Sequence, residues 1–477
     1  MNSNLISPEI SVSALASLLE DLKQAGSELH SIVLYRDNVK KLSWSLFPHS
    51  QEEKREMYSV SKSFTSTAFG VAFDAGLIRP EDKLVRFFPE YRSLWEKDER
   101  WQQVTLHHVL TMAPGHSSCV MAGMANAPDA AAAFFSAPLS YAPGERFAYN
   151  TGATFMAGEA VRRVTGETVP EILARYVFPA IGIENFTWLN IRDGHCAAGV
   201  GLHISCEDLA KLGLLYFNRG MVGSRRILSE EWVEMATKAQ IPNSDNGTPD
   251  WCAGYGYQFW RNARGGYRAD GAFGQGCFVL PQKGIVCAFT SESKDLTAAF
   301  DRIQDFLEEP GKHFPEKTTL PEQFSLEEEW TGEPFDSQWR RLNPNPVGLT
   351  GLRLLREKDR ATLYLGDGQG VQALKVIRGK WVENTLFARE LKPSLYTFSD
   401  RSQPMEIRLS AAPVSAGEDF LLECRCLNCP HRFLLRVAFP GGKAVLTLES
   451  EFDVFSAEKK ITEKESLGKA MCREALE

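Results

Sequence analysis

The sequence lacks the features that mark membrane, exported and nucleic-acid-binding proteins. No apolar stretch reaches the roughly 18 residues that a membrane-spanning helix needs. Residues 1–11 lack the positive start, the apolar run and the small-residue cleavage site of an export signal. No basic run is present, and the 477 residues carry a formal net charge of −8. Because nucleic-acid-binding proteins usually present a basic face to phosphate, we expect no nucleic-acid partner. The missing membrane span and export signal lead us to expect a cytoplasmic protein with no membrane partner.

Cysteine frameworks and metal motifs are also missing. Ten cysteines are spread over the chain without framework spacing, as expected in a reducing compartment. Cys424, Cys426, Cys429 and His431 have the ligand types of a zinc site. However, Cys424 and Cys426 lie two apart on one face of a predicted strand, and Cys429 falls in the following turn, so packed thiols are favoured over zinc.

The sequence motifs of several other enzyme classes are absent. There is no His-Glu-x-x-His, and no Gly-x-Ser-x-Gly that would pair a histidine with a nucleophilic serine. We interpret His107, His108 and His116 as structural residues. Gly366 to Gly370, "GDGQG", lacks the strand-to-helix setting of a nucleotide-binding loop and predicts a hairpin turn. We therefore predict neither a metal nor an organic cofactor.

What is present predicts an α+β unit over residues 1–310. Apolar spacing predicts helices over 12–28, 59–77 and 295–309, with mostly helix and loop between 84 and 235. Two strands, 30–37 and 41–47, form a hairpin around Asp37-Asn38, and further strands are predicted over 251–261, 273–282 and 284–292. The sheet thus draws on both ends of the unit, with helices between.

A second unit follows a change in composition. Residues 311–323 are rich in proline and charge, which is typical of a linker. Short alternating segments over 324–477 predict a small all-β sandwich or barrel, with a polar tail from about residue 457. This unit could cover a cleft, hold a partner or mediate self-association as a homodimer, and its sequence does not choose among these roles.

One charged residue stands out in the first unit. Ser59-Val60-Ser61-Lys62 is a Ser-x-x-Lys, and three residues of helix bring the serine hydroxyl and the lysine amine within reach. The motif also occurs at Ser291, Ser456 and Ser466, where the surroundings are polar. Lys62 alone lies on a helix that is apolar on most of its circumference, so its ammonium should be buried.

Burial of Lys62 has two outcomes. The amine either finds partners or loses its proton more easily, and a neutral amine can act as a general base for the Ser59 hydroxyl. At the helix N-terminus, Ser59 would also lie among backbone N–H groups that stabilise developing negative charge. The structural alternative is that Ser59 is an N-cap and Lys62 pairs with a buried carboxylate.

Two later stretches of the sequence add further polar groups that could belong to the same site. Tyr149, Asn150 and Thr151 lie on a loop between a Pro-Gly turn and a helix, where they can face a cleft. Ala269-Asp270-Gly271 stands at a strand rich in glycine, where a chain without Cβ atoms can approach a ligand closely. Taken alone, each stretch is more typical of a turn than of a binding site.

Together, these motifs resemble the serine β-lactamase and penicillin-binding-protein superfamily, over about residues 28–308. The branch that the pattern is most similar to contains class C β-lactamases, D-alanyl-D-alanine carboxypeptidases, esterases and 6-aminohexanoate-dimer hydrolase. The flanking strings "YSVSKSFTS", "VTLHHVLTMAPGH", "PGERFAYNTGA" and "DGAFGQ" agree in order. The resemblance implies a β-lactamase/transpeptidase-like antiparallel sheet flanked by a helical region.

The resemblance also implies roles for individual residues. Ser59 would be the nucleophile of an acyl-enzyme mechanism, Lys62 would help to remove its proton, and Tyr149 would relay a proton to the leaving group. Asn150 or Thr151 would steady Lys62 and the substrate carbonyl, although "Tyr-Asn-Thr" departs from the family's Tyr-x-Asn. The backbone N–H groups of Ser59 and Ala272 would form the oxyanion hole.

The third motif departs further from the family. Asp270 and Gly271 follow an alanine where the family has Lys-Thr-Gly or His-x-Gly. The lost lysine usually holds a substrate carboxylate, so we expect a neutral or cationic acyl donor rather than a penicillin. The sequence therefore predicts a serine hydrolase of a small-molecule or peptide-like amide or ester. The alternative is a catalytically silent relative that binds such a molecule in the cleft.

Overall fold

The computed structural model describes residues 4–191, 193–244, 247–314, 319–321, 329–330, 334–341, 349–367, 370–388, 405–416, 420–439, 444–449 and 472–473. The chain divides into two compact units. One comprises residues 1–45 and 50–320, and the other comprises residues 46–49 and most of 321–477. Parts of the predicted linker and nearly all of the predicted polar tail lie outside the described residues.

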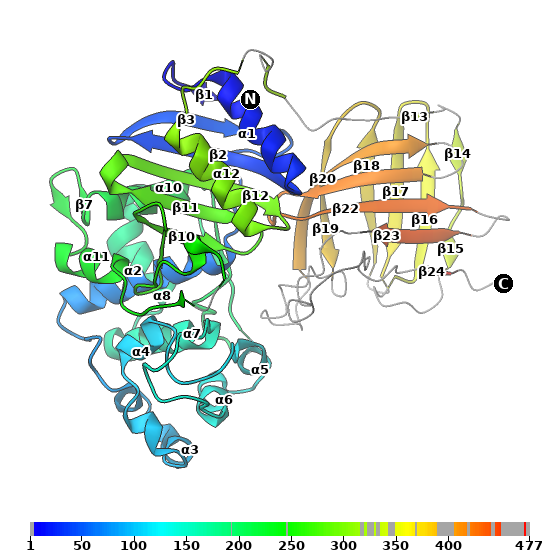
Figure 1. Ribbon diagram of the computed structural model, residues 1–477. Helices are drawn as coiled ribbons and strands as arrows, with labels where there is room; N and C mark the ends of the chain where they lie inside the picture. The colour runs from blue at the N-terminus through cyan, green and yellow to red at the C-terminus, as the bar shows by residue number, and fades with distance from the viewer. Residues whose placement is uncertain are drawn as a thin grey trace. The chain divides into compact units, whose positions relative to one another are not determined.

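Three helices of the first unit fall where apolar spacing predicts them, and the others lie between residues 92 and 237, in the region predicted as mostly helix and loop (Figure 1). Their bounds are α1 Val12–Gln24, α2 Ser61–Asp74, α3 Arg92–Trp95, α4 Leu106–Leu110, α5 Met121–Ala125, α6 Ala130–Ser136, α7 Thr151–Thr165, α8 Val169–Ile172, α9 Phe178–Ile181, α10 Cys206–Phe217, α11 Glu230–Thr237 and α12 Leu296–Glu308. In the described part, no helix is long and apolar enough to cross a bilayer.

The main sheet of this unit is antiparallel and joins both ends of its sequence, with strand order β1-β3-β2-β12-β11-β10-β9. These strands are β1 Leu5–Ile6, β2 Ser27–Arg36, β3 Val39–Ser45, β9 Trp260–Arg261, β10 Tyr267–Gly271, β11 Gln275–Leu280 and β12 Ile285–Ser293. The N-terminal hairpin meets the later strands where β2 pairs with β12. The α+β fold is confirmed, with its sheet built from both ends of the unit.

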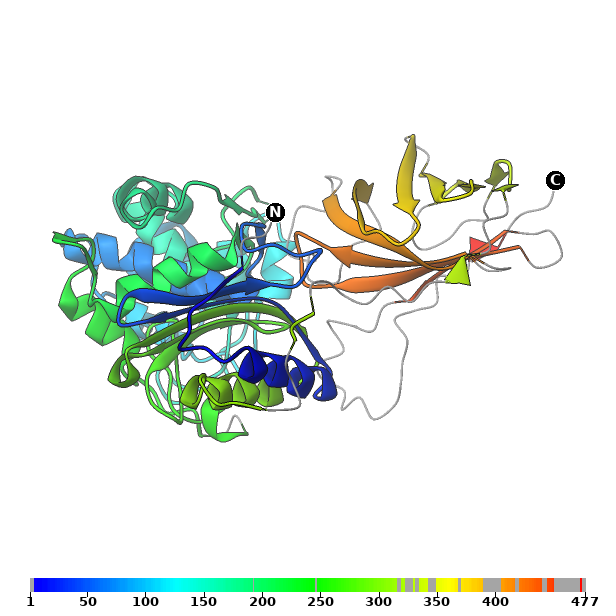
Figure 2. The same cartoon turned by 90° about the horizontal axis from the view of Figure 1, so that it is seen from above.

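Two small sheets accompany the main one. The order β4-β6-β5 joins Arg55–Glu56, Leu202–Ile204 and Thr187–Trp188, and β7 Met221–Val222 pairs with β8 Arg225–Arg226. Figure 2 shows α1 in dark blue and α12 in yellow-green on one face of the main sheet, with the other helices on the opposite face. Since β4 ends just before α2 begins, the β4-β6 pairing fixes the entry to that helix.

Helix α2 is central to the unit. Nearly all of its residues are buried, polar ones included. At Gly70 an added Cβ would lie 2.3 Å from the Trp232 side chain, so the helix approaches α11 too closely for any side chain there. Trp232 also stacks on Phe69 at 5.1 Å between ring centres. Because nearly all of α2 is buried, the Lys62 side chain lies in the core and does not face solvent.

The second unit is all-β, as predicted. One sheet has the order β13-β20-β21-β22-β23-β24 with β19 beside β20, and the other has the order β14-β16-β17-β18 with β15 beside β16. Their bounds are β13 Glu329–Trp330, β14 Phe335–Asp336, β15 Arg340–Arg341, β16 Gly351–Arg356, β17 Arg360–Gly366, β18 Val371–Ile377, β19 Val382–Ala388, β20 Met405–Ala416, β21 Phe420–Cys426, β22 Arg432–Ala438, β23 Val445–Glu449 and β24 Cys472–Arg473. Both sheets contribute side chains to one apolar core.

Several local predictions can be compared with this unit. The strands on either side of "GDGQG", β17 and β18, pair antiparallel, as the predicted hairpin requires, while residues 368–369 of the turn lie outside the described residues. Cys424, Cys426 and Cys429 are buried in the core of the unit. In the part of the chain that the structure describes, no group of three or more His, Cys, Asp or Glu side chains is arranged to hold a metal ion.

Two local predictions in the first unit were wrong. Residues 251–261 were predicted as a strand, but only Trp260–Arg261 is one. Gly254 has a positive φ, and Gly256 packs so closely on the Ala236 carbonyl that no Cβ fits, so this stretch does not continue as a regular strand. The second Ser-x-x-Lys was placed in polar surroundings, but Ser291 is buried in β12. Because Ser291 lies on strand β12 and Lys294 follows the end of that strand, the two residues do not share the helical face that brings a hydroxyl and an amine together. Ser456 and Ser466 lie outside the described residues.

Candidate functional site

Ser59 lies in a tight turn directly before α2. Tyr58–Val60 form one 3₁₀ turn, and the helix begins at Ser61. Tyr58 has φ +47°, a conformation that a bulky residue adopts only when its surroundings hold it. Ser59 itself is only partly buried, so its hydroxyl is at the edge of the core. A strained turn therefore presents the candidate nucleophile.

Lys62 lies one helical turn further on and is 1% exposed. Its Nζ donates hydrogen bonds to Ser59 Oγ at 2.9 Å and to the Gly199 carbonyl at 2.8 Å. Burial lowers the pKa of Lys62 to about 7, although the charges of Cys119 and Asp270 oppose that change. Both oxygens that accept hydrogen bonds from the amine are uncharged, so they stabilise the ammonium less than a carboxylate would. The amine therefore loses its proton near neutral pH.

Tyr149 covers the Lys62 amine. Nζ lies 4.9 Å from the centre of the phenol ring, and the ring stacks on Trp260 at 5.6 Å. Burial raises the pKa of Tyr149 far above its usual value, with Asp270 adding to the rise and a hydrogen bond with the Ser59 side chain opposing it. The phenol therefore keeps its proton at neutral pH, and it lies beside both the hydroxyl and the amine.

Asn150 and Thr151 have different surroundings from Tyr149. Asn150 is fully buried and caps α7: its Oδ1 accepts from the backbone N–H of Gly152 at 3.0 Å and of Val120 at 3.2 Å. Its amide nitrogen lies 3.1 Å from His116 Nδ1. Lys62 donates its hydrogen bonds instead to Ser59 and to a backbone carbonyl. Thr151 begins α7, and its N–H donates to Cys119 Sγ at 3.3 Å.

The carbonyl that holds Lys62 belongs to a glycine that the sequence analysis did not assign. At Gly199 an added Cβ would lie 2.7 Å from Thr151 Cγ2, so the segment approaches the start of α7 closely. The neighbouring Ala198 carbonyl accepts from Thr65 Oγ1 at 2.8 Å on α2. The glycines of "GVGLHI" were a signal of close backbone approach, but the sequence does not show which helix they approach.

The third motif lies on β10, against the Ser59 turn. An added Cβ at Gly271 would come within 2.4 Å of the Met57 carbonyl oxygen and 3.3 Å of the Ser59 nitrogen. Only a glycine allows this contact, which brings the residues around Gly271 next to Ser59. Ala272 follows immediately, and its carbonyl accepts from Gln275 Nε2 at 3.3 Å.

Asp270 is held by an arginine two residues earlier on the same face of β10. Arg268 Nε donates to Asp270 Oδ2 at 2.9 Å, and both side chains are buried. Arg268 is fixed in turn by the carbonyls of Asp250 and Arg261 and by the Trp251 ring, 4.6 Å away. Burial raises the pKa of Asp270, while Arg268 and Lys62 lower it. A carboxyl group thus stands near Lys62, at the position of the threonine in the Lys-Thr-Gly form of the family motif.

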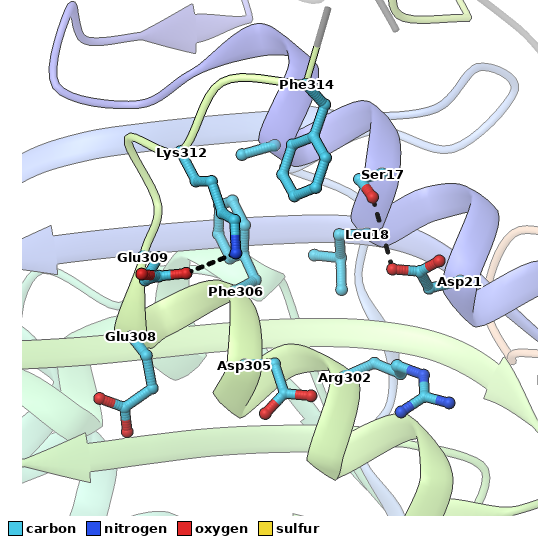
Figure 3. Close-up of a pocket in the computed structure, with 11 residues that line it drawn as sticks. Ser17, Leu18, Asp21, Arg302, Asp305, Phe306, Glu308, Glu309, Lys312 and Phe314 are labelled. Atoms are coloured by element: carbon cyan, nitrogen blue, oxygen red, sulfur yellow. Dashed lines mark hydrogen bonds and ion pairs between the residues drawn. The ribbon is translucent and has the colours of Figure 1, made fainter. Parts of the chain in front are cut away.

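A surface groove elsewhere in the first unit does not belong to this site. It lies between α1 and α12 and is lined by Ser17, Leu18, Asp21, Arg302 and Phe306, among others (Figure 3). Its polar groups are largely paired: Ser17 with Asp21, and Lys312 with Glu309. The groove shares no residue with the Ser59 site, so it carries none of the chemistry described above.

The arrangement defines a class of protein. The Lys62 amine contacts the Ser59 hydroxyl at the head of a buried helix, with the Tyr149 phenol over the amine and the strand of Gly271 beside the serine. This arrangement resembles the site expected from the motifs of the serine β-lactamase and transpeptidase-like fold. The chain belongs to the Beta-lactamase family, whose sequence profile matches residues 30–308. The resemblance inferred from the motifs is therefore confirmed.

Several known proteins are similar to the chain. The 6-aminohexanoate-dimer hydrolase of Paenarthrobacter ureafaciens is 24% identical over 310 residues, which are 60% of this chain and 79% of that protein. EstCE1, a hydrolase with promiscuous acyltransferase activity, superposes with a TM-score of 0.52 at 16% identity, covering 61% of this chain and 98% of EstCE1.

One solved structure extends over both units. The octameric penicillin-binding protein homologue from Pyrococcus abyssi has a TM-score of 0.51 at 18% identity, and the match covers 91% of this chain and 97% of the homologue. At this identity the likeness concerns the fold alone.

We predict that Gly271→Ala lowers the reactivity of Ser59. The new Cβ must push β10 away from the Met57 carbonyl, and a displacement of about 1 Å in a reacting site can cost on the order of 100-fold in rate. The rate of labelling by a fluorophosphonate measures the effect. Gly123→Ala, where the Cβ meets open space, is the control. Equal labelling rates in the two variants would contradict the prediction.

Proposed function

We propose that this protein is a serine hydrolase that cleaves an amide or ester of a small-molecule or peptide-like substrate through an acyl-Ser59 intermediate. The observation that carries the proposal is the 2.9 Å contact between Ser59 Oγ and a buried Lys62 amine whose pKa is lowered to about 7. The relatives named as hydrolases support the type of reaction.

Lys62 is the general base in this proposal. When neutral, its amine accepts the Ser59 proton while Oγ forms a bond to the substrate carbonyl carbon. Tyr149 is a poor candidate for this step, because burial keeps its phenol protonated at neutral pH. At the ordinary lysine pKa only about one amine in several thousand would be neutral at pH 7, whereas a pKa of about 7 makes about half of them neutral.

Tyr149 is the proton relay. After attack, the ammonium of Lys62 holds the proton taken from Ser59, and the leaving group needs a proton to depart. The phenol lies beside both Lys62 and Ser59, so it can donate its proton to the leaving amine or alkoxide and regain one from Lys62. Water then attacks the acyl-Ser59 ester by the reverse route and releases the acid, restoring the serine hydroxyl.

The oxyanion of the tetrahedral intermediate needs two donors. The backbone N–H groups of Ser59 and Ala272 are our candidates, since Gly271 packs directly on the Ser59 turn. Each such donor is typically worth about 3 kcal/mol of transition-state stabilisation, and main-chain donors do not depend on the altered side chains of the third motif.

Asp270 favours neutral or cationic acyl donors. Arg268 binds one carboxyl oxygen of Asp270 in a buried ion pair, which favours the charged form of Asp270 and opposes the rise in its pKa that burial causes. A substrate carboxylate placed near this group would be repelled, whereas an ammonium or amide N–H would be attracted. Penicillins and peptides ending in a free carboxylate are therefore unfavourable substrates.

A catalytically silent binding protein is the alternative function. The missing lysine of the third motif favours it, while the Lys62–Ser59 contact and the retained Tyr149 favour catalysis. The two functions differ in one property, because a silent binder does not acylate its serine.

We predict that a fluorophosphonate probe labels Ser59 in the purified protein and that short p-nitrophenyl esters are hydrolysed. Ser59→Ala removes the nucleophile and should abolish both, as measured by mass spectrometry of the labelled peptide and by release of p-nitrophenol. Ser136→Ala, at an exposed position, serves as the control. Unlabelled wild-type protein would favour the silent binder instead.

We predict that kcat/KM rises with pH through about 7 and levels off above it. Only neutral Lys62 accepts the Ser59 proton, and the amine becomes neutral as the pH passes its pKa. Asp270→Asn removes an anion that raises the Lys62 pKa, so the midpoint should move to lower pH.

Two lysine variants complete the pH experiment. Lys62→Arg should be inactive at every pH, because a guanidinium stays charged. Lys294→Arg, in the Ser-x-x-Lys of β12, is the matched control and should keep the wild-type profile. A flat profile between pH 5 and 9 would rule out Lys62 as the base.

We predict a substrate preference that depends on charge. Among the p-nitroanilides of 6-aminohexanoate, hexanoate and adipate, the anionic adipate should have the lowest kcat/KM, by about tenfold or ~1.4 kcal/mol. Asp270→Asn should reduce this discrimination, because it removes the repelling charge. If the wild type prefers the adipate compound, the assignment to Asp270 is wrong.

A further inference from the structure

Glu56 joins the two segments that build the site. It is the last residue of β4, and its side chain is buried. Its Oε1 accepts the backbone N–H of Tyr58 at 3.1 Å and the backbone N–H of Gly201 at 2.8 Å. One carboxyl oxygen therefore connects the turn before α2 to the strand segment before β6.

One of these segments contains Ser59, and the other provides the carbonyl that accepts a hydrogen bond from Lys62. Tyr58 directly precedes Ser59 and is held at φ +47°, so its backbone needs an external contact to stay in that conformation. Gly201 lies two residues after Gly199, whose carbonyl accepts the Lys62 amine. Displacing either segment would change the distance between Ser59 Oγ and Lys62 Nζ.

We propose that Glu56 is a positioning residue that fixes the Ser59 turn against the carbonyl partner of Lys62. The proposal rests on the proposed function, in which these two groups react together. Other bonds run between the same segments, from Met57 N–H to the Leu202 carbonyl and from Leu202 N–H to Ser61 Oγ. Glu56 differs from them because it binds the backbone N–H of Tyr58, the residue with the strained conformation.

The second oxygen of Glu56 faces His203. His203 Nδ1 lies 3.1 Å from the Gly201 carbonyl, which can only accept, so Nδ1 carries a hydrogen. His203 Nε2 lies 3.4 Å from Glu56 Oε2, and an attraction between them requires a proton on one of the two atoms. Burial raises the pKa of the Glu56 carboxyl, whereas His203 lowers it.

This geometry makes glutamine a conservative replacement at position 56. Its amide oxygen can accept the Tyr58 and Gly201 N–H groups as Oε1 does, and its NH₂ group can donate to a neutral His203 Nε2. Alanine removes both bonds and leaves two buried N–H groups without their partner. The two variants therefore separate the loss of the bonds from the loss of the charge.

The test compares Glu56→Gln and Glu56→Ala with wild-type protein, with Glu159→Ala as the matched control. Glu159, on α7, is also a buried carboxylate of this unit. It binds Arg162 at 2.8 Å and His195 at 2.9 Å. Its loss reports the general effect of removing a buried acid. kcat and KM on a neutral p-nitrophenyl ester are measured alongside hydrogen exchange of a peptide covering residues 56–64.

We expect Glu56→Ala to lower kcat about 100-fold with KM within about threefold, because a displaced nucleophile reacts slowly although the cleft still binds. Glu56→Gln should keep kcat within about fivefold of wild type. Exchange in the 56–64 peptide should rise in the alanine variant and stay unchanged in the glutamine and Glu159→Ala variants.

Two results would overturn the proposal: wild-type kcat in Glu56→Ala, or an equal loss in Glu56→Gln. A wild-type protein without turnover would count against the proposed function instead. In that case the exchange measurement still decides the positioning role, because unchanged exchange in Glu56→Ala would refute it.

Discussion

The contact between the Lys62 amine and the Ser59 hydroxyl is the interaction on which the rest of the site depends. Moving the lysine pKa from its ordinary value to about 7 corresponds to about 5 kcal/mol of lost preference for the charged form. This change follows from burial, because Lys62 lies on a helix whose residues are nearly all buried in the core of the unit. Burial and reactivity are therefore two consequences of the same packing.

The partners of Lys62 determine which form of the amine is present. A carboxylate in hydrogen-bond contact would hold the ammonium and leave Ser59 without a base. The bonds go instead to a hydroxyl and a backbone carbonyl, while the nearby Asp270 is paired with Arg268. The arginine thus stabilises the charge of Asp270 and limits how strongly that carboxyl stabilises the Lys62 ammonium. The structural alternative considered from the sequence, a simple lysine-carboxylate pair, does not describe this geometry.

Sequence reasoning succeeded where the determining contacts are local. The spacing of Ser59 and Lys62 on one helix, the hairpin around Asp37-Asn38 and the apolar period of α12 each depend on residues close in the chain. Contacts between distant segments could not be found in this way. Gly199, Glu56 and Arg268 bind the site through partners that the sequence does not place beside them, and Asn150 caps a helix although its neighbours suggested a cleft-facing role.

The charge state of Lys62 is the central claim, and NMR can measure it directly. With lysine carrying ¹³C at Cε, the signal that disappears in Lys62→Arg identifies Lys62, and its chemical shift can be followed from pH 5 to 11. The account predicts a titration midpoint of about 7. A midpoint near the ordinary lysine value of about 10.5 would mean that the amine is charged under working conditions, and would contradict the account.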